Sequence, residues 1–325
     1  MANVAASNWT VNSTSNASLV AGRFAGQAFQ HTGTSQRYLE RAIPATNTLS
    51  LGVAIRIGDI TDLAEQTSLL SFFNASAQLQ IAIDITVTGQ IIALRGATGL
   101  GTSAEEAPIF EDGVWRYIEV ELFINDATGY VKVYRDGALI LNVENVDTQN
   151  QSGDDIGVVR MWGCEAGNAV SVFAYDDIYC TNDGTRLGEC RVSTLVPTSD
   201  TADVDWTPLG AGDHYAEVDD DDGDTSYIAS ATPGDLDMFG LGDLPFTPTT
   251  IYAIQTTFRA RKDDVATREI RAKIRSNGTT DEGATEPLAS NYLYYHDVFE
   301  QDPDTTAAWA AAAVDTLEVG VETVT

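Results

Sequence analysis

The chain of 325 residues carries 18 Lys and Arg residues against 48 Asp and Glu residues, which gives a formal net charge of −30. Such a charge opposes binding to nucleic-acid phosphates and to anionic membrane surfaces, so we expect no nucleic acid and no membrane insertion. Hydrophobic residues make up 43% of the chain and aromatic residues 9%, too much for a mainly disordered protein. The longest apolar run, residues 307–314, is too short to span a bilayer.

The first part of the chain, residues 1–190, reads as short strands separated by turns. Apolar and polar residues alternate with period two, and β-branched and aromatic residues are frequent, in segments 49–57, 79–87, 91–95, 117–124 and 130–134. Asp136 and Gly137 tolerate positive φ and predict a hairpin after the last of these segments. The pattern predicts an all-β sandwich over residues 1–190.

The second part, residues 191–325, predicts a smaller β-rich domain closed by one helix. Segments 251–261 and 268–275 read as two paired strands joined by a short loop. Asp302 suits a helix cap and Pro303 the first helical position, and apolar residues then recur at helical spacing as far as Leu317. The chain also exceeds the roughly 250–300 residues above which single cores tend to split, which favours two domains.

Four segments taken in order resemble the laminin-G/concanavalin-A-like jelly roll. They are RFAGQAFQHTG (23–33), GVWRYIEVELFIN (113–125), GYVKVYRDGALIL (129–141) and FAYDDIYC (173–180). In that family a Trp precedes the strand that corresponds to YIEVELFI, a D-G hairpin follows, and the last strand ends in an Asp-Asp pair. The resemblance implies a jelly-roll sandwich in the first domain.

A second resemblance covers most of the chain and is most specific in its second half. The segments DWTP (205–208), DGDTSY (222–227), ARKDD (260–264) and DPDTTAAW (302–309) look like those of a family of tailed-bacteriophage virion proteins. The resemblance implies a non-enzymatic component of the virion, assembled in the host cytoplasm. Its implied partners are copies of itself and other virion proteins.

Two positions on a virus particle fit this interpretation. As a tail-tip or fibre-associated protein, the chain assembles through its second domain and displays the sandwich to a host-surface glycan. The alternative is a capsid decoration (cement) protein that stabilises the head shell. A cluster of exposed aromatic residues and carboxylates at one end of the sandwich favours the first position. A large exposed apolar or basic patch where shell subunits meet, with no concave site, favours the second.

Motifs of catalysis are absent from the sequence. Retaining glycosidases of the concanavalin-A-like fold resemble one another in an E-x-D-x-E strand that holds two carboxylates across a sugar bond. The closest strand here offers only Glu119 and Glu121. The nucleophile elbow, the P-loop, H-E-x-x-H and a strand followed by G-x-G-x-x-G do not occur. We therefore expect no enzyme.

Two groups of carboxylates are candidate cation ligands. Asp220, Asp222 and Asp224 alternate as calcium ligands do, although Val218 and Ala229 break the EF-hand pattern at both ends, and a solvated acidic turn is the alternative. Calcium is the single cofactor that this run suggests. For the Asp176–Asp177 pair we expect hydrogen bonds from the backbone of a neighbouring turn, with cation binding as the alternative.

Two further features suggest contacts with partners. Trp162, beside Gly163, is the best candidate for an exposed sugar-stacking ring, whereas Trp115 and Trp309 are expected to be buried. A basic group stands out in the acidic chain, and it fits equally well a solvated strand face or a docking surface for the acidic patch of a neighbouring subunit. Its members proposed for that interface are Arg259, Arg261, Arg268, Arg271 and Lys273.

Overall fold

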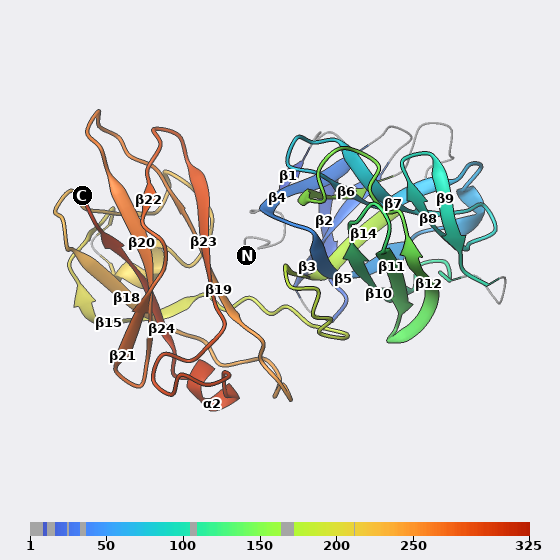
Figure 1. Cartoon of the computed structure of the whole chain (residues 1–325). Coiled ribbons are helices and arrows are strands. Elements are labelled where there is room, and N and C mark those ends of the chain that lie inside the picture. The colour runs from blue at the N-terminus through green and yellow to red at the C-terminus, as the bar shows by residue number, and fades with distance from the viewer. Residues whose placement is uncertain are drawn as a thin grey trace. The chain divides into compact units, whose positions relative to one another are not determined.

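The computed structural model describes residues 9–11, 17–24, 26–32, 37–104, 109–163, 172–210 and 212–325. The chain divides into two compact units: a sandwich unit, Trp9–Val192, and a C-terminal unit that takes in Ser193–Thr325 (Figure 1). The predicted fold class is confirmed, because both units are built from antiparallel sheets and the described residues contain one short α-helix. No helix of the described residues has the length and hydrophobicity needed to cross a membrane.

Two seven-stranded antiparallel sheets form the sandwich unit. Sheet A has the order β1 (Thr10–Val11), β4 (Tyr38–Thr46), β13 (Ile156–Trp162), β6 (Thr67–Phe73), β7 (Leu79–Ile85), β8 (Ile91–Arg95) and β9 (Thr98–Thr102). Sheet B has the order β12 (Ala138–Val146), β11 (Gly129–Arg135), β10 (Trp115–Phe123), β5 (Thr48–Ile57), β14 (Val172–Thr181), β3 (Gln27–Thr32) and β2 (Ala17–Ala21). A short 3₁₀ helix, η2 (Ile60–Asp62), follows β5.

The alternation seen in the sequence fills the space between the two sheets. In sheet B, Leu51 of β5 lies in register with Val120 of β10, and both are fully buried. In sheet A, Met161 of β13 lies opposite Leu70 of β6, again without exposure. Each strand therefore turns every second side chain into the core, and the residues between them form the outer face of its sheet. Burial of this apolar area is the main force that holds the sheets together.

The predicted hairpin after residue 134 is present. Asp136 and Gly137 have φ angles of 49° and 82° and join β11 to β12. The carboxylate of Asp136 also accepts a hydrogen bond from the backbone N–H of Tyr117 at 2.9 Å. The turn therefore uses both the tolerance of these residues for positive φ and the side chain of the aspartate.

The C-terminal unit is built around one larger sheet and two ribbons. The larger sheet has the order β15 (Pro197–Val204), β18 (Leu236–Leu241), β24 (Glu318–Thr323), β20 (Glu269–Ser276) and β21 (Thr279–Glu282), with β22 (Glu286–Pro287) also paired to β20. The ribbons are β19 (Ile254–Ala260) with β23 (Leu293–Phe299), and β16 (Thr207–Pro208) with β17 (Ile228–Ala229). A 3₁₀ helix, η3 (His214–Glu217), lies between β16 and β17 in the chain.

The predicted pairing of segment 251–261 with segment 268–275 is wrong. Strand β19 pairs with β23, whereas β20 lies between β24 and β21 in the larger sheet. The intervening loop moves the chain from the ribbon to the sheet, and its Lys262 N–H donates to the carbonyl of Ala289 at 2.8 Å. Alternation alone predicts strands but not their partners, because several registers satisfy the same pattern.

The predicted C-terminal helix is much shorter than expected. Asp302 accepts hydrogen bonds from the Asp304 N–H and the Thr305 hydroxyl, at 3.0 and 3.1 Å, and so closes a turn. Trp309 then enters the core of the unit, pairs with Ile251 in an extended bridge, and donates its Nε1–H to the Phe299 carbonyl at 2.9 Å. The α-helix α2 therefore spans only Ala311–Val314. The predicted burial of Trp309 is confirmed, with 4% of the residue exposed.

Candidate functional site

The outer face of sheet A carries an aromatic group around one arginine. Arg160 and Trp162 are two residues apart on β13, so their side chains share that face. The register places Glu40 and Tyr38 of β4 beside them, and Phe73 of β6 lies next to Val158 in the adjacent row. We call these five residues, Tyr38, Glu40, Phe73, Arg160 and Trp162, the Arg160 platform.

Three rings surround the guanidinium of Arg160. Its central carbon lies 3.8 Å from the ring centroid of Tyr38, 4.3 Å from that of Phe73 and 5.0 Å from that of Trp162. The rings of Tyr38 and Trp162 meet edge to face, with their centroids 5.1 Å apart. These distances are those of cation–π contacts, which hold the arginine in one conformation.

Polar contacts fix the orientation of the platform. Arg160 donates from Nε to Glu40 Oε2 at 2.9 Å, and its Nη2 bonds to the same oxygen. The indole Nε1–H of Trp162 donates to the Ser71 hydroxyl at 2.8 Å, which turns the ring toward β6. The Arg160 and Glu40 side chains keep 16% and 28% of their area exposed. A ligand at this surface therefore meets aromatic rings and a carboxylate–guanidinium pair that are already in place.

The sequence predicted only one member of this group. Trp162, expected to be exposed, is half-buried on the outer face of sheet A. The other aromatic residues, Tyr38 and Phe73, come from strands about 90 to 125 residues earlier in the chain, and strand register alone brings them together. One signal was available, because the alternation in VVRMW places Arg160 on the face of Trp162.

Trp115, expected to be buried, is half-buried on sheet B with Arg56 4.9 Å from its ring.

The outer face of sheet B is covered by the end of the sandwich unit itself. Glu119 of β10 is 1% exposed and accepts hydrogen bonds from Tyr179 Oη at 2.6 Å and the Gly188 N–H at 2.8 Å. Arg186 adds an ion pair to Glu119 at 2.7 Å and lies 3.5 Å from Glu121. The two carboxylates nearest to the glycosidase pattern are thus bound by Tyr179 of β14 and by residues of the segment that follows this strand.

The Asp-Asp pair at β14 accepts backbone hydrogen bonds, as expected. Asp176 accepts from the Arg23 N–H at 2.7 Å, and Asp177 accepts from the Val192 N–H at 2.9 Å. Asp177 has a φ of 50°, is 4% exposed, and has its Oδ2 3.6 Å from Arg23 Nη1. Burial raises the pKa of Asp177 to about 6, although the hydrogen bond from Val192 acts in the opposite direction.

The three aspartates of the candidate calcium site do not form a metal-ligating cluster in the described structure. Asp222 accepts hydrogen bonds from the backbone and hydroxyl of Ser226 at 3.1 and 2.7 Å, and Asp224 bonds to Arg261 and Tyr292. Asp220 is exposed. Across the described ranges, which include this acidic run, no three His, Cys, Asp or Glu side chains are placed to hold a metal ion. Two of the three carboxylates therefore have partners within the chain, Asp222 in Ser226 of its own turn and Asp224 in Arg261 and Tyr292.

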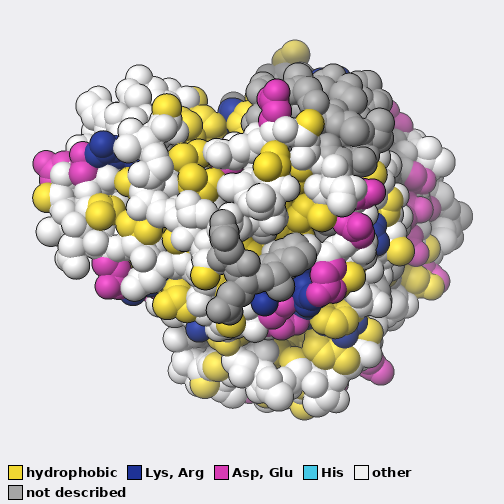
Figure 2. All heavy atoms as spheres, turned by 90° about the vertical axis from the view of Figure 1, so that its right-hand side faces the viewer, with side chains coloured by type: hydrophobic (Ala, Val, Ile, Leu, Met, Phe, Trp, Pro, Cys, Tyr) yellow, Lys and Arg dark blue, Asp and Glu magenta, His cyan; other side chains and the backbone are white. Residues whose placement is uncertain are grey.

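The basic group forms ion pairs within the C-terminal unit. Arg259 pairs with Asp221 at 2.6 Å, Arg261 with Asp224 at 3.1 Å and Arg268 with Asp264 at 2.8 Å. Arg271 and Lys273 both pair with Glu282 and Glu322, at distances of 2.6 to 2.9 Å. The free positive charge on which the interface prediction depended is therefore compensated inside the chain. Figure 2 looks onto the side of Figure 1 that carries strands of the sandwich unit, and on that face too basic side chains lie beside acidic ones.

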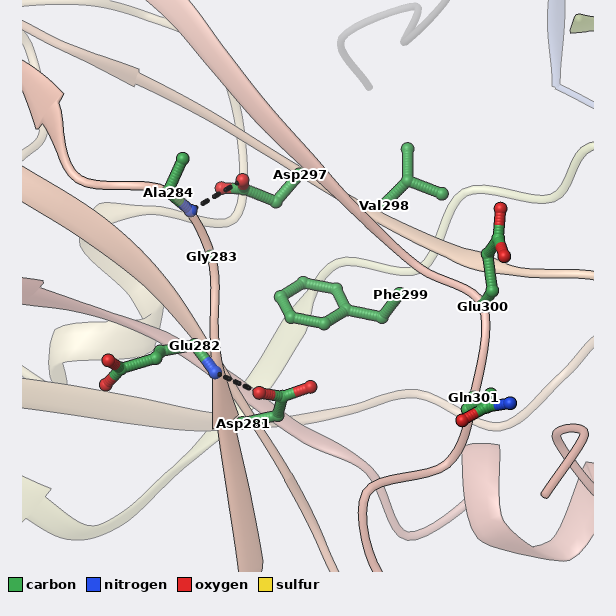
Figure 3. Close-up of a pocket in the computed structure, with 9 residues that line it drawn as sticks. All are labelled: Asp281, Glu282, Gly283, Ala284, Asp297, Val298, Phe299, Glu300 and Gln301. Atoms are coloured by element: carbon green, nitrogen blue, oxygen red, sulfur yellow. Dashed lines mark hydrogen bonds between the residues drawn. The ribbon is translucent and has the colours of Figure 1, made fainter. Parts of the chain in front are cut away.

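An open pocket in the C-terminal unit is lined by nine residues, four of which are acidic (Figure 3). Asp281 lies at one side, where it accepts a hydrogen bond from the Glu282 N–H at 2.9 Å. Asp297 accepts a hydrogen bond from the Ala284 N–H at 2.9 Å, and Phe299 and Glu300 are among the other lining residues. The bonds drawn in Figure 3 thus link the lining residues to one another.

Comparison with known proteins finds no matching family model and no matching curated protein. Several solved structures resemble the chain. A cellulose-induced protein, Cip1, is 14% identical with a TM-score of 0.43, covering 56% of this chain and 93% of its own. An alginate lyase, Aly36B, is 12% identical with a TM-score of 0.41, covering 53% and 86%. The carbohydrate-binding module CBM66 from Bacillus subtilis is 12% identical with a TM-score of 0.32, covering 51% and 92%.

These likenesses correct one prediction. From the missing motifs we expected that the chain is not an enzyme. That prediction is contradicted, because an alginate lyase is among the similar structures. At such low identity and TM-score the similarity extends at most to the fold.

Proposed function

We propose that the chain is a component of a tailed virus particle whose sandwich unit binds a host-surface glycan through the Arg160 platform. The observation that carries the glycan part is the arrangement of Tyr38, Phe73 and Trp162 around Arg160. Aromatic rings offer apolar faces to the C–H groups of a sugar, and a guanidinium–carboxylate pair offers donors and acceptors to its hydroxyls. This combination suits saccharides better than purely apolar or purely ionic ligands.

The platform is organised before a ligand arrives. Arg160 is held by Glu40 and by three rings, and Trp162 is held by Ser71. All of these residues lie in strands of one sheet, so little side-chain freedom remains to be lost on binding. Affinity for a saccharide then depends chiefly on the contacts made, not on rearrangement.

The virion part of the proposal is supported by the sequence resemblance, above all by the DWTP, DGDTSY and DPDTTAAW segments of the C-terminal unit. In this proposal the C-terminal unit assembles with other virion proteins and with copies of itself. The tail position is preferred to capsid decoration, because the basic patch that would have favoured decoration is neutralised by Asp221, Glu282 and Glu322. Cryo-EM localisation in the intact particle tests this part: density at the tail is expected, and density only on the head lattice would contradict it.

The glycan part is tested by binding of the full chain to a glycan array, followed by calorimetric titration with the best ligand. Trp162→Ala is expected to weaken binding about tenfold or more, which corresponds to about 1.4 kcal/mol. Trp115→Ala is the matched control, because it removes another half-buried, arginine-stacked tryptophan from the opposite sheet. Equal affinity of Trp162→Ala and the natural protein would refute the proposal, as would an array without any bound glycan.

A further inference from the structure

The charges on the outer face of sheet A narrow the class of glycan. In addition to the Arg160–Glu40 pair, this face carries one more carboxylate, that of Asp84 on β7. Asp84 is 7% exposed, and its oxygens accept hydrogen bonds from Gln66 Nε2 and Ser68 Oγ, both at 2.7 Å. These partners are neutral, so the negative charge of Asp84 is not cancelled by them.

The other cations of these strands belong to the opposite face. Arg41 of β4 lies in register with Val159, and Arg95 of β8 lies in register with Ile81, and both of these partners are core residues. Arg95 is moreover paired with Asp147. Among the described residues of β4, β13, β6, β7 and β8, the outer face therefore carries two carboxylates and one guanidinium.

The single guanidinium is not available as a free charge. Arg160 donates hydrogen bonds from Nε and Nη2 to Glu40. An acidic sugar would have to displace that carboxylate to form its own ion pair with the guanidinium. Displacement would leave the Glu40 carboxylate close to the incoming anion. Charges more than about 8 Å away are largely screened at physiological salt, so the nearby Glu40 carboxylate, and not the net charge of −30, supplies most of this repulsion.

An uncharged sugar meets none of these penalties. Within the described residues Glu40 accepts hydrogen bonds from Nε and Nη2 of Arg160 only. The Nη1 donors therefore remain for sugar hydroxyls. The Glu40 carboxylate supplies acceptor capacity, and the rings of Tyr38 and Trp162 supply apolar faces. Building on the proposed function, we infer that the Arg160 platform selects neutral hexose oligosaccharides and discriminates against uronate and sulfated glycans.

The test compares the full chain with oligosaccharides of glucose, galactose and mannose and with the corresponding uronates of equal length. The expected result is that at least one neutral ligand binds tenfold or more tightly than its uronate, with an affinity that changes little between low and high salt. Glu40→Gln is expected to reduce the difference in affinity between the neutral ligand and its uronate by improving uronate binding, and Asp84→Asn, on a strand two away from β13, is expected to do so by a smaller amount. Trp162→Ala is expected to weaken binding of the neutral ligand.

Three other outcomes would contradict, respectively, the inferred glycan class, its assignment to the Arg160 platform, and glycan binding itself. A uronate that binds more tightly than its neutral counterpart, with an affinity that falls as salt is added, overturns the inferred class while glycan binding survives. A preference for the neutral ligand that Trp162→Ala leaves untouched overturns the assignment to the Arg160 platform. Failure of every saccharide to bind removes both this inference and the proposed function.

Discussion

The guanidinium of Arg259 lies 2.6 Å from the carboxylate of Asp221, across 38 residues of sequence. Each residue belongs to a run that stands out in the sequence, one basic and the other acidic. Neighbouring members repeat the relationship, because Arg261 pairs with Asp224. Two members of the basic run, Arg259 and Arg261, are therefore partners of two members of the acidic run, Asp221 and Asp224.

The first prediction concerns the strength of this pairing. Arg259 and Asp221 keep 31% and 24% of their side chains exposed, so solvent screens much of their attraction. We expect a double-mutant cycle with Arg259→Ala and Asp221→Ala to give a coupling of about 0.2–1 kcal/mol, decreasing with salt. Thermal or chemical unfolding of the C-terminal unit measures it. A coupling well above this range, or one independent of salt, would show that the pair is more than a surface contact.

The second prediction concerns the covered face of sheet B. Arg186→Ala removes the cation that faces Glu119, which is almost completely buried. Loss of one partner from a buried ion pair commonly costs about 3–5 kcal/mol, and we expect the lower part of this range because Tyr179 and Gly188 still donate to Glu119. Lys132→Ala is the control, because its partner Glu144 is exposed. Equal denaturation midpoints for the two variants would contradict the structural role of Arg186.

The third prediction concerns pH. Burial raises the pKa of Asp177 to about 6, above its ordinary value of 3.8. The folded protein therefore holds this proton more tightly than the unfolded chain does, so the stabilisation is fully present below about pH 4 and is lost as pH rises through 6. The loss is at most about 3 kcal/mol. Other carboxylates titrate in the same range, so the measured quantity is the difference between natural protein and Asp177→Asn.

Asp177→Asn keeps an oxygen that can accept from the Val192 N–H but does not ionise. Its stability relative to the natural protein is expected to rise between pH 4 and pH 7. A constant difference across this interval would show that Asp177 titrates normally and that its burial does not perturb it.

The fourth prediction concerns a fully buried carboxylate in the C-terminal unit. Asp237 lies 2.6 Å from His214 Nδ1 and accepts a hydrogen bond from the Trp206 N–H at 2.8 Å. Asp237→Ala leaves the Trp206 N–H and His214 Nδ1 without this acceptor. It is expected to lower the free energy of unfolding by about 2–4 kcal/mol. Asp237→Asn, which retains a carbonyl oxygen, is expected to cost less. Calorimetry of the two variants checks the order, and equal losses would contradict it.

The sandwich was predictable because its cause is local. Alternation around Leu51, Val120 and Val131 reports which side chains face the core, and Asp136 with Gly137 marks a turn by its own conformational preferences. No information from distant parts of the chain is needed for either inference. The same is true of Trp309, whose size and apolar surroundings indicated burial.

The features that escaped prediction depend on long-range register. Tyr38, Phe73 and Arg160 meet only because β4 and β6 flank β13, and one sequence does not state that order. The C-terminal helix was overestimated because its spacing also suits a chain that turns at Asp302 and then buries Trp309. The charge runs were each interpreted alone, whereas the energy of a charge depends on the partner that the fold brings to it.

The most direct measurement of the central claim is a crystal structure of the full chain with the glycan selected on the array. We predict sugar density over the rings of Tyr38 and Trp162, with hydroxyls bonded to Arg160 and Glu40. Density on the outer face of sheet B or on the C-terminal unit, with the Arg160 platform unoccupied, would contradict the account.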